Sequence, residues 1–198
     1  MNAETKHEIE QHVRGILSCI GENPDRAGLT GTPDRIARMY QEIFRGYDPE
    51  QKPKITTFDN GMDGLSYSDI ITDCGSFYSM CEHHMMPFFG TYFFAYIPHP
   101  EGKILGLSKV ARVVDYCAAR LQVQERLAYD VVKMLYDALH EGTEHEPLAM
   151  AVILRGEHLC KSMRGVKKPG HMESMYIGGQ FHDPAKRKEL LDLYSHTV

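Results

Sequence analysis

Two short segments containing cysteine and histidine are the most distinctive chemical feature of the sequence. Cys81 and His84 have the C-x2-H spacing that allows both side chains to reach one ion from a tight turn. His158 and Cys160 lie two residues apart, so their side chains would point to the same side of an extended strand. Thiolates and imidazoles are ligands that suit zinc. The two segments together therefore predict a zinc site.

The number of candidate ligands favours a catalytic site. Cys81, His84 and Cys160 supply three ligands, which leaves His83 and His158 beside the metal. Three protein ligands with an open position for water and titratable neighbours are typical of hydrolytic zinc sites. A closed Cys2His2 structural site is one alternative. The other is that no metal binds, with the cysteines buried as small apolar residues and the histidines hydrogen-bonded.

Charged residues elsewhere are candidates for binding a polar or anionic substrate. Glu125 stands in the first turn of a predicted helix, where the helix dipole alone would also favour it. Basic residues that could bind phosphate oxygens are Lys109, Arg112, Arg164, Arg35 and Arg38. A solvated surface is the alternative interpretation of these basic residues. In a chain of net charge −5, a local basic cluster fits a small, multiply charged anion better than a polynucleotide.

Composition indicates a soluble globular protein. Of the 198 residues, 42% are hydrophobic and 25% charged, which excludes disordered, collagen-like and mucin-like chains. The longest apolar stretch, residues 85–98, is shorter than the roughly 20 residues that span a bilayer. The polar first residues lack a secretory signal, and five widely spaced cysteines do not suggest a disulfide framework. We therefore expect a cytoplasmic protein with neither a membrane nor a nucleic-acid partner.

The elements that must position these residues follow from hydrophobic periodicity. Helical spacing predicts helices over residues 4–20, from 32 to about 45, 108–117, 122–140 and from 184 onward. Extended segments are expected at residues 54–58, 65–71, 91–97, 103–107, 148–154, 157–160 and 175–178, with a hairpin loop at 98–102. Strands followed by paired helices and then strands again indicate an α+β fold with a mostly antiparallel sheet.

Six motifs, in this order along the chain, resemble those of GTP cyclohydrolase I. They are Gly-Leu-Thr-Gly-Thr-Pro-Asp-Arg at 28–35, Cys-Glu-His-His at 81–84, Ala-Tyr-Ile-Pro at 95–98, Gly-Leu-Ser-Lys at 106–109, Arg-Leu-Gln-Val-Gln-Glu-Arg at 120–126 and His-Leu-Cys-Lys-Ser-Met-Arg-Gly-Val at 158–166. The resemblance extends over roughly residues 5–182.

The resemblance implies a zinc-dependent hydrolase that converts GTP and water to 7,8-dihydroneopterin triphosphate and formate, the first step of folate or tetrahydropterin biosynthesis. Carried over by position, Cys81, His84 and Cys160 would hold Zn²⁺. His158 would be the acid/base at purine N7 while zinc-bound water attacks C8, and His83 would assist later proton transfers.

The resemblance also assigns the substrate contacts. Glu125 would hold the guanine edge with the support of Gln124, because a carboxylate can accept two hydrogen bonds from an N–H and an amino group. Residues expected to bind the triphosphate are Ser108, Lys109, Arg112, Arg164, Arg35 and Arg38. Two departures, Phe93 in place of a common histidine and the segment 171–176, affect the expected rim of the pocket.

The family fold implied is a tunnelling fold, with a four-stranded antiparallel sheet and two paired helices over residues 51–198, preceded by an N-terminal helical extension over residues 1–50. The implied assembly is a homodecamer, a dimer of pentamers with active sites shared between subunits. Two other hypotheses remain: a paralogue that uses another purine nucleotide or stops at the formamide intermediate, and a noncatalytic protein stapled by zinc.

Overall fold

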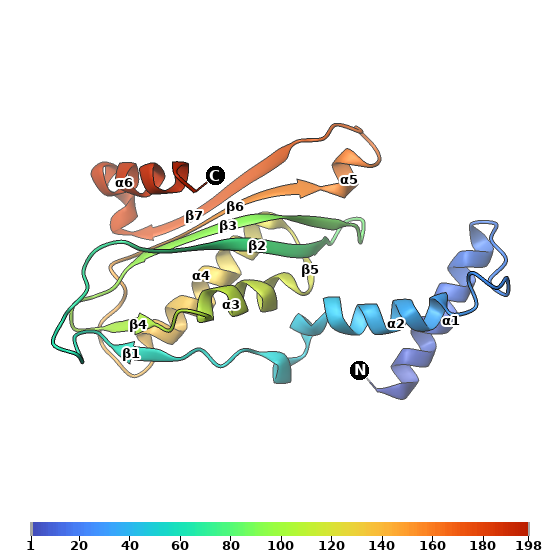
Figure 1. Ribbon diagram of the computed structural model, residues 1–198, viewed down its shortest axis with the longest axis horizontal. Helices are drawn as coiled ribbons and strands as arrows, with labels where there is room; N and C mark the ends of the chain where they lie inside the picture. Colours follow the sequence, from blue (N-terminus) through green and yellow to red (C-terminus); the bar gives the residue numbers. More distant parts are fainter. Residues whose placement is uncertain (1, 198) are drawn as a thin grey trace.

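A five-stranded sheet forms the centre of the computed structural model, which describes residues 2–197 (Figure 1). Its order is β5-β2-β3-β6-β7, with bounds Leu121–Gln122, Ile71–Cys81, Pro87–Ile97, Ala149–His158 and His171–Gly179. The four long strands pair antiparallel, whereas the two-residue β5 pairs parallel to the end of β2. The α+β class is confirmed, and β5 is an addition to the four strands expected.

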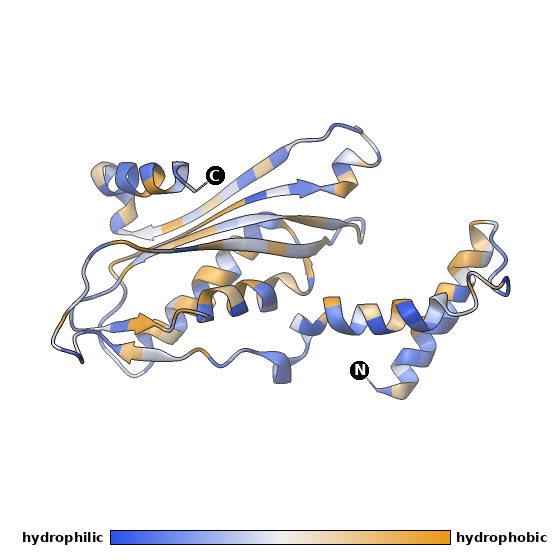
Figure 2. Ribbon diagram, viewed as in Figure 1, coloured by the Kyte–Doolittle hydropathy of each residue, from blue (hydrophilic) through white to orange (hydrophobic). Residues whose placement is uncertain are grey.

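Helices cover both faces of this sheet. In Figure 1, α3 (Lys109–Ala118) and α4 (Gln124–His140) lie on one side and α6 (Pro184–Ser195) on the other. The short 3-10 helix η3 (Gln180–His182) leads into α6, whose first turn is capped by the Asp183 carboxylate. These helices agree with the periodicity predicted for them, and Figure 2 shows hydrophobic and hydrophilic residues mixed along α3 and α4.

The alternation of side chains along β3 explains why the sheet is buried on both faces. Phe88, Tyr92 and Phe94 belong to the core beneath α3 and α4. Phe93 and Ala95 point the opposite way, into a second core beneath α6. Successive strand residues face opposite sides, so a nearly continuous apolar run is required where both sides are covered.

The N-terminal helices α1 (Ala3–Cys19) and α2 (Thr32–Ile43) pack against each other and extend beyond the sheet (Figure 1). Two 3-10 turns, η1 (Arg45–Tyr47) and η2 (Pro49–Gln51), follow α2. Gly46 joins this segment to the C-terminal end of α3, where its N–H donates to the Ala119 carbonyl at 2.9 Å. A Cβ added at Gly46 would lie 2.4 Å from the Tyr116 carbonyl oxygen, so only glycine fits.

A separate two-stranded antiparallel sheet joins β1 (Thr57–Asp59) to β4 (Lys103–Leu105). The hairpin predicted at residues 98–102 is therefore wrong. Strand β3 pairs with β2 and β6 and makes no pair with β4. After β3 the chain leaves the main sheet, and β4 pairs with β1.

Two further predictions of extended structure are wrong. Residues 65–70 form no strand, and β2 instead covers residues 71–81, where small and polar residues conceal its alternation. The extended segment predicted at 157–160 ends at His158, and the helical turn α5 (Leu159–Ser162) follows. No helix among residues 2–197 combines the length and apolar character needed to cross a membrane.

Candidate metal centre and catalytic pocket

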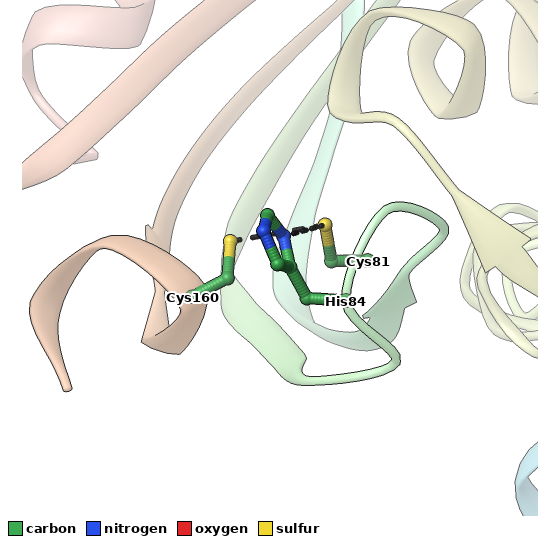
Figure 3. Close-up of side chains that lie close together, drawn as sticks. All are labelled: Cys81, His84 and Cys160. Atoms are coloured by element: carbon green, nitrogen blue, oxygen red, sulfur yellow. Dashed lines mark hydrogen bonds between the residues drawn. The ribbon is translucent and has the colours of Figure 1, made fainter. Parts of the chain in front are cut away.

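Cys81, His84 and Cys160 converge at one end of the sheet (Figure 3). Cys81 ends β2, His84 lies in the turn before β3, and Cys160 lies in α5. The two sulfur atoms are 3.7 Å apart, and the Cys81 sulfur is 3.8 Å from His84 Nδ1. The turn is closed by the Cys81 carbonyl, which accepts from the Met85 N–H at 2.8 Å.

The donor set fits zinc. Two sulfurs bound at about 2.3 Å to one tetrahedral ion would be about 3.8 Å apart, close to the separation of Cys81 and Cys160. Burial raises the pKa of the Cys160 thiol, and the neighbouring Cys81 sulfur raises it further. A cation would therefore be needed to stabilise both thiolates at neutral pH. Cys160 reaches this position from a helical turn, although the sequence pattern predicted a strand.

His83 lies at the open side of the same turn. Its side chain is 65% exposed, with Nε2 at 3.9 Å from Glu82 Oε1 and Nδ1 at 3.9 Å from the Cys81 sulfur. The ring is thus beside the ligand cluster and accessible to a substrate.

His158, in contrast, is half-buried and is held by contacts with Phe88 and Gln124. Its ring stacks on Phe88 with centroids 4.6 Å apart and planes 4° from parallel. Its Nε2 lies 3.0 Å from Oε1 of Gln124, which is 1% exposed. Burial lowers the pKa of His158, the carboxylate of Glu125 raises it in part, and Lys161 lowers it. The neutral imidazole is favoured, and its conjugate acid is a stronger proton donor than an exposed histidine.

The orientation of the Gln124 amide determines which nitrogen of His158 is protonated. Gln124 Nε2 donates to the carbonyls of Leu154 and Met172 at 3.0 Å and lies 3.1 Å from Ser174 Oγ. Oε1 must therefore face His158, whose Nε2 is the donor. Met172 and Ser174 belong to the segment 171–176, so one departure from the family pattern directly supports this residue.

The other departure, Phe93, lies away from the candidate centre. It is buried beneath α6, with its ring centroid 5.5 Å from that of Tyr194. Its side chain belongs to the second core, on the face of the sheet opposite His158 and Phe88.

Glu125 follows the buried Gln124 in the first turn of α4 and is exposed. Its charge acts on His158, which places the carboxylate near this histidine. Arg164 is also brought to the centre, with Nη1 at 2.8 Å from His84 Nε2.

One chain does not bring the other predicted phosphate-binding residues to this centre. Ser108, Lys109 and Arg112 lie at the start of α3, which in Figure 1 begins on the side of β4 and runs toward β5. Arg35 and Arg38 are on α2, where they contact Thr32 and Asp34 of the same helix.

A hydrogen-bonded chain of side chains that was not predicted from the sequence supports the ligand turn. Gln122 is fully buried, and its Nε2 donates to the Cys117 carbonyl at 3.1 Å and to Asp130 Oδ2 at 2.9 Å. Its Oε1 accepts from Arg126 Nε at 2.8 Å, and Arg126 Nη2 pairs with the Glu82 carboxylate. The sequence feature that could have predicted this support is the pair Gln122 and Gln124 on either side of Val123, since both glutamine side chains are buried.

Most of the chain is similar to proteins of one family. The family model described as GTP cyclohydrolase I matches residues 9–195. The protein named GTP cyclohydrolase 1 from Caldanaerobacter subterraneus subsp. tengcongensis is 48% identical over 167 residues, which cover 83% of this chain and 82% of the relative. Its namesake from Streptomyces griseus is 44% identical over 195 residues, covering 98% and 92% respectively. That from Lactiplantibacillus plantarum is 42% identical over 184 residues, with 91% of each chain covered.

Proposed function

The chain belongs to the GTP cyclohydrolase I family, and we propose that Cys81, His84 and Cys160 hold the zinc ion with which it converts GTP and water to 7,8-dihydroneopterin triphosphate and formate. The observation that carries this assignment is the convergence of two sulfurs and one imidazole beside a half-buried, oriented histidine. Zinc at this position would supply Lewis acidity and lower the pKa of water near purine C8.

His158 is the proposed acid/base for the purine N7. Because Nε2 donates to Gln124, the proton exchanged with the substrate is held at Nδ1. Burial lowers the pKa of His158, which makes the protonated ring a better acid toward a weakly basic purine nitrogen. His83, exposed beside the turn, would move protons during the later sugar rearrangement and ring closure.

Glu125 is the proposed guanine ligand, because its exposed carboxylate can accept hydrogen bonds from both N1–H and the 2-amino group. The side chain of Gln124 has its donors engaged within the chain, which supports a positioning role for it. Guanine binding next to His158 would place C8 and N7 within the same pocket.

Arg164 is the proposed triphosphate ligand from the same chain. A guanidinium can only donate, so His84 accepts at Nε2 and carries its proton on Nδ1 in the contact described. His84 would carry that proton on Nε2 once Nδ1 binds the metal. The contact is then lost, and Arg164 becomes available to a phosphate oxygen.

The remaining phosphate ligands, Ser108, Lys109, Arg112, Arg35 and Arg38, would come from neighbouring subunits. Their distance from the ligand cluster within one chain supports an assembly with shared sites, and the family suggests a homodecamer built as a dimer of pentamers. The corresponding architecture is a tunnelling fold over residues 51–198 with a helical extension over residues 1–50. We also propose a cytoplasmic location.

The test is to incubate zinc-loaded protein with GTP, oxidise the products and measure neopterin fluorescence together with formate. His158→Ala and chelation should each abolish both signals, whereas His182→Ala, an exposed histidine in η3, should retain them. Formate without neopterin would indicate a paralogue that stops after ring opening. Neither signal from zinc-bound protein would favour a structural metal site or another purine substrate.

A further inference from the structure

A second set of potential metal ligands lies at the opposite end of β3 from the Cys81 turn. His99, Glu101 and His145 each offer a ligand atom, and these atoms lie within 4.8 Å of one another. The eleven residues of β3 separate the two sets by about 35 Å at roughly 3.3 Å per residue. This cluster is therefore independent of the proposed catalytic centre.

The three side chains come from two connections that are distant in sequence. His99 and Glu101 lie between β3 and β4, and His145 lies between α4 and β6. The two imidazole rings stack with centroids 4.5 Å apart and planes 13° from parallel. His145 Nε2 is 3.6 Å from Glu101 Oε2, so the carboxylate already lies beside one ring.

Backbone hydrogen bonds hold the first connection in this arrangement. The His99 carbonyl accepts from the Asn60 side-chain amide and from the Gly102 N–H, both at 2.9 Å. Asn60 is only 9% exposed, and its own N–H donates to the Gly102 carbonyl at 2.8 Å. The positions of His99 and Glu101 are thus set by a buried amide, without any ion.

The second connection packs closely against the first. His145 N–H donates to Thr143 Oγ1 at 3.1 Å, which shapes the backbone next to the ring. A Cβ added at Gly102 would lie 3.0 Å from His99 Cβ and 3.5 Å from His145 Cβ. The two histidines are therefore brought together by packing of the loops.

We propose that His99, Glu101 and His145 form a second divalent-metal site, which ties the β3–β4 connection to the α4–β6 connection. Two imidazoles and one carboxylate, without a thiolate, suit Zn²⁺, Ni²⁺ or Cu²⁺. His99 Nδ1 now accepts a hydrogen bond from the Glu101 N–H at 3.1 Å. Coordination through that nitrogen replaces one exposed, neutral hydrogen bond with a metal–ligand bond. Since Glu101 is largely exposed, the site remains open to water and binds more weakly than the two-thiolate centre.

Cobalt titration of the full chain distinguishes the two sites, because only the centre with Cys81 and Cys160 gives an intense thiolate-to-cobalt charge-transfer band. We expect a first equivalent of Co²⁺ to develop that band and a second equivalent to bind without adding to it. His145→Gln should lower the affinity for the second equivalent at least 100-fold. The band, the first equivalent and GTP turnover at one zinc per chain should stay unchanged in this variant.

His182→Gln is the matched control, since His182 is exposed in η3 and belongs to neither ligand set. It should retain both equivalents. Binding of only one equivalent to the unaltered chain would overturn the proposal, as would equal loss of the second equivalent in both variants. Far-UV circular dichroism checks that each variant is folded. The cobalt readout does not depend on GTP, so failure of the proposed enzymatic function would leave it interpretable.

Discussion

Gln124 Oε1 lies 3.0 Å from His158 Nε2, and the Gln124 amide cannot reverse because its Nε2 already donates to the carbonyls of Leu154 and Met172. One buried side chain thus fixes both the position and the tautomer of the proposed acid/base. In the proposed positioning role, Gln124 is therefore expected to influence the chemical step through His158.

Replacing Gln124 with methionine tests this relationship. The variant leaves the Leu154 and Met172 carbonyls without this donor, which should lower the free energy of unfolding by about 1–3 kcal/mol. We also expect kcat to fall at least about tenfold as His158 loses its orientation, with zinc content unchanged. Urea unfolding, turnover and metal analysis measure the three effects. Glu125→Gln, in the same turn but exposed, should instead raise KM for GTP with little change in stability.

Gly156→Ala would disturb the same Gln124 amide through a steric clash. The added Cβ would lie 2.6 Å from Gln124 Oε1 and 3.2 Å from Phe77 Cζ, so the amide must move away from His158. We expect loss of turnover together with about 1–3 kcal/mol of stability. Gly178→Ala is the control, because nothing lies within 4 Å of its added Cβ. Equal behaviour of the two variants in unfolding and turnover assays would contradict the role assigned to Gly156.

Unfolding at different pH values tests the environment of His158. Because its pKa is lowered in the folded protein, the unfolded chain binds this proton more readily. The stability contribution is therefore present above the ordinary pKa of about 6.5 and is lost as pH falls through the lowered value. Urea unfolding of the original chain and of His158→Gln, compared at pH 8 and pH 5, should show a smaller acid-side loss in the variant. An unchanged acid-side loss would argue against this assignment.

The five cysteines should differ strongly in reactivity. Burial raises the pKa of Cys117 to about 12, about three units above its ordinary value. At neutral pH its thiolate fraction is then about a thousandfold smaller than that of an unperturbed thiol. Cys19 and Cys74 are exposed. We expect a thiol-specific reagent to label these two first, and Cys117 only after unfolding. Mass mapping of labelled peptides checks this order, and early labelling of Cys117 would exclude a tightly packed α3.

The support of the ligand turn can be tested through Arg126. The Arg126 guanidinium donates to the buried Gln122 side chain through Nε and to the Glu82 carboxylate through Nη2. Glu82 immediately precedes the two histidines of the turn. Arg126→Lys keeps the charge and removes the fork, so we expect kcat to decrease while KM and zinc content are retained. Lys133→Arg serves as a control, because Lys133 pairs with Asp137 on the exposed surface of the same helix. Loss of zinc from the Arg126 variant would instead show that this residue maintains the ligand cluster itself.

The helices and the grouping of Cys81, His84 and Cys160 were predictable from the sequence, whereas several positions within the fold were not. The repeat of Leu127, Val131 and Leu135 places one apolar face of α4 on the sheet, which a period of 3.6 residues reveals. Strand β2 carries Cys74, Gly75 and Ser76 in its middle, so neither β-branched residues nor strict alternation mark it.

The residue types of the candidate metal cluster were predictable from the sequence, whereas the local backbone conformation around them was not. Cys160 meets Cys81 from a helical turn, because α5 reverses the chain directly after β6. The role of Gln124 depends on acceptors 30 and 48 residues away, which no local pattern contains. The positions of Lys109 and Arg112 at the start of α3 could not be related to the ligand cluster from the sequence, and the proposed shared site would bring such residues from a neighbouring subunit.

The docking of Gly46 on Ala119 gives the α1–α2 pair a mechanical connection to the metal turn. Arg120 Nη2 donates to the Gly46 carbonyl at 2.9 Å. The next residue, Leu121, begins β5, and its backbone N–H donates to the Tyr47 hydroxyl oxygen at 3.1 Å. Strand β5 in turn pairs Gln122 with Cys81. A short series of hydrogen bonds therefore connects the helical pair to a proposed zinc ligand. We expect a displacement of this pair by a neighbouring molecule to be transmitted to the ligand turn through these bonds.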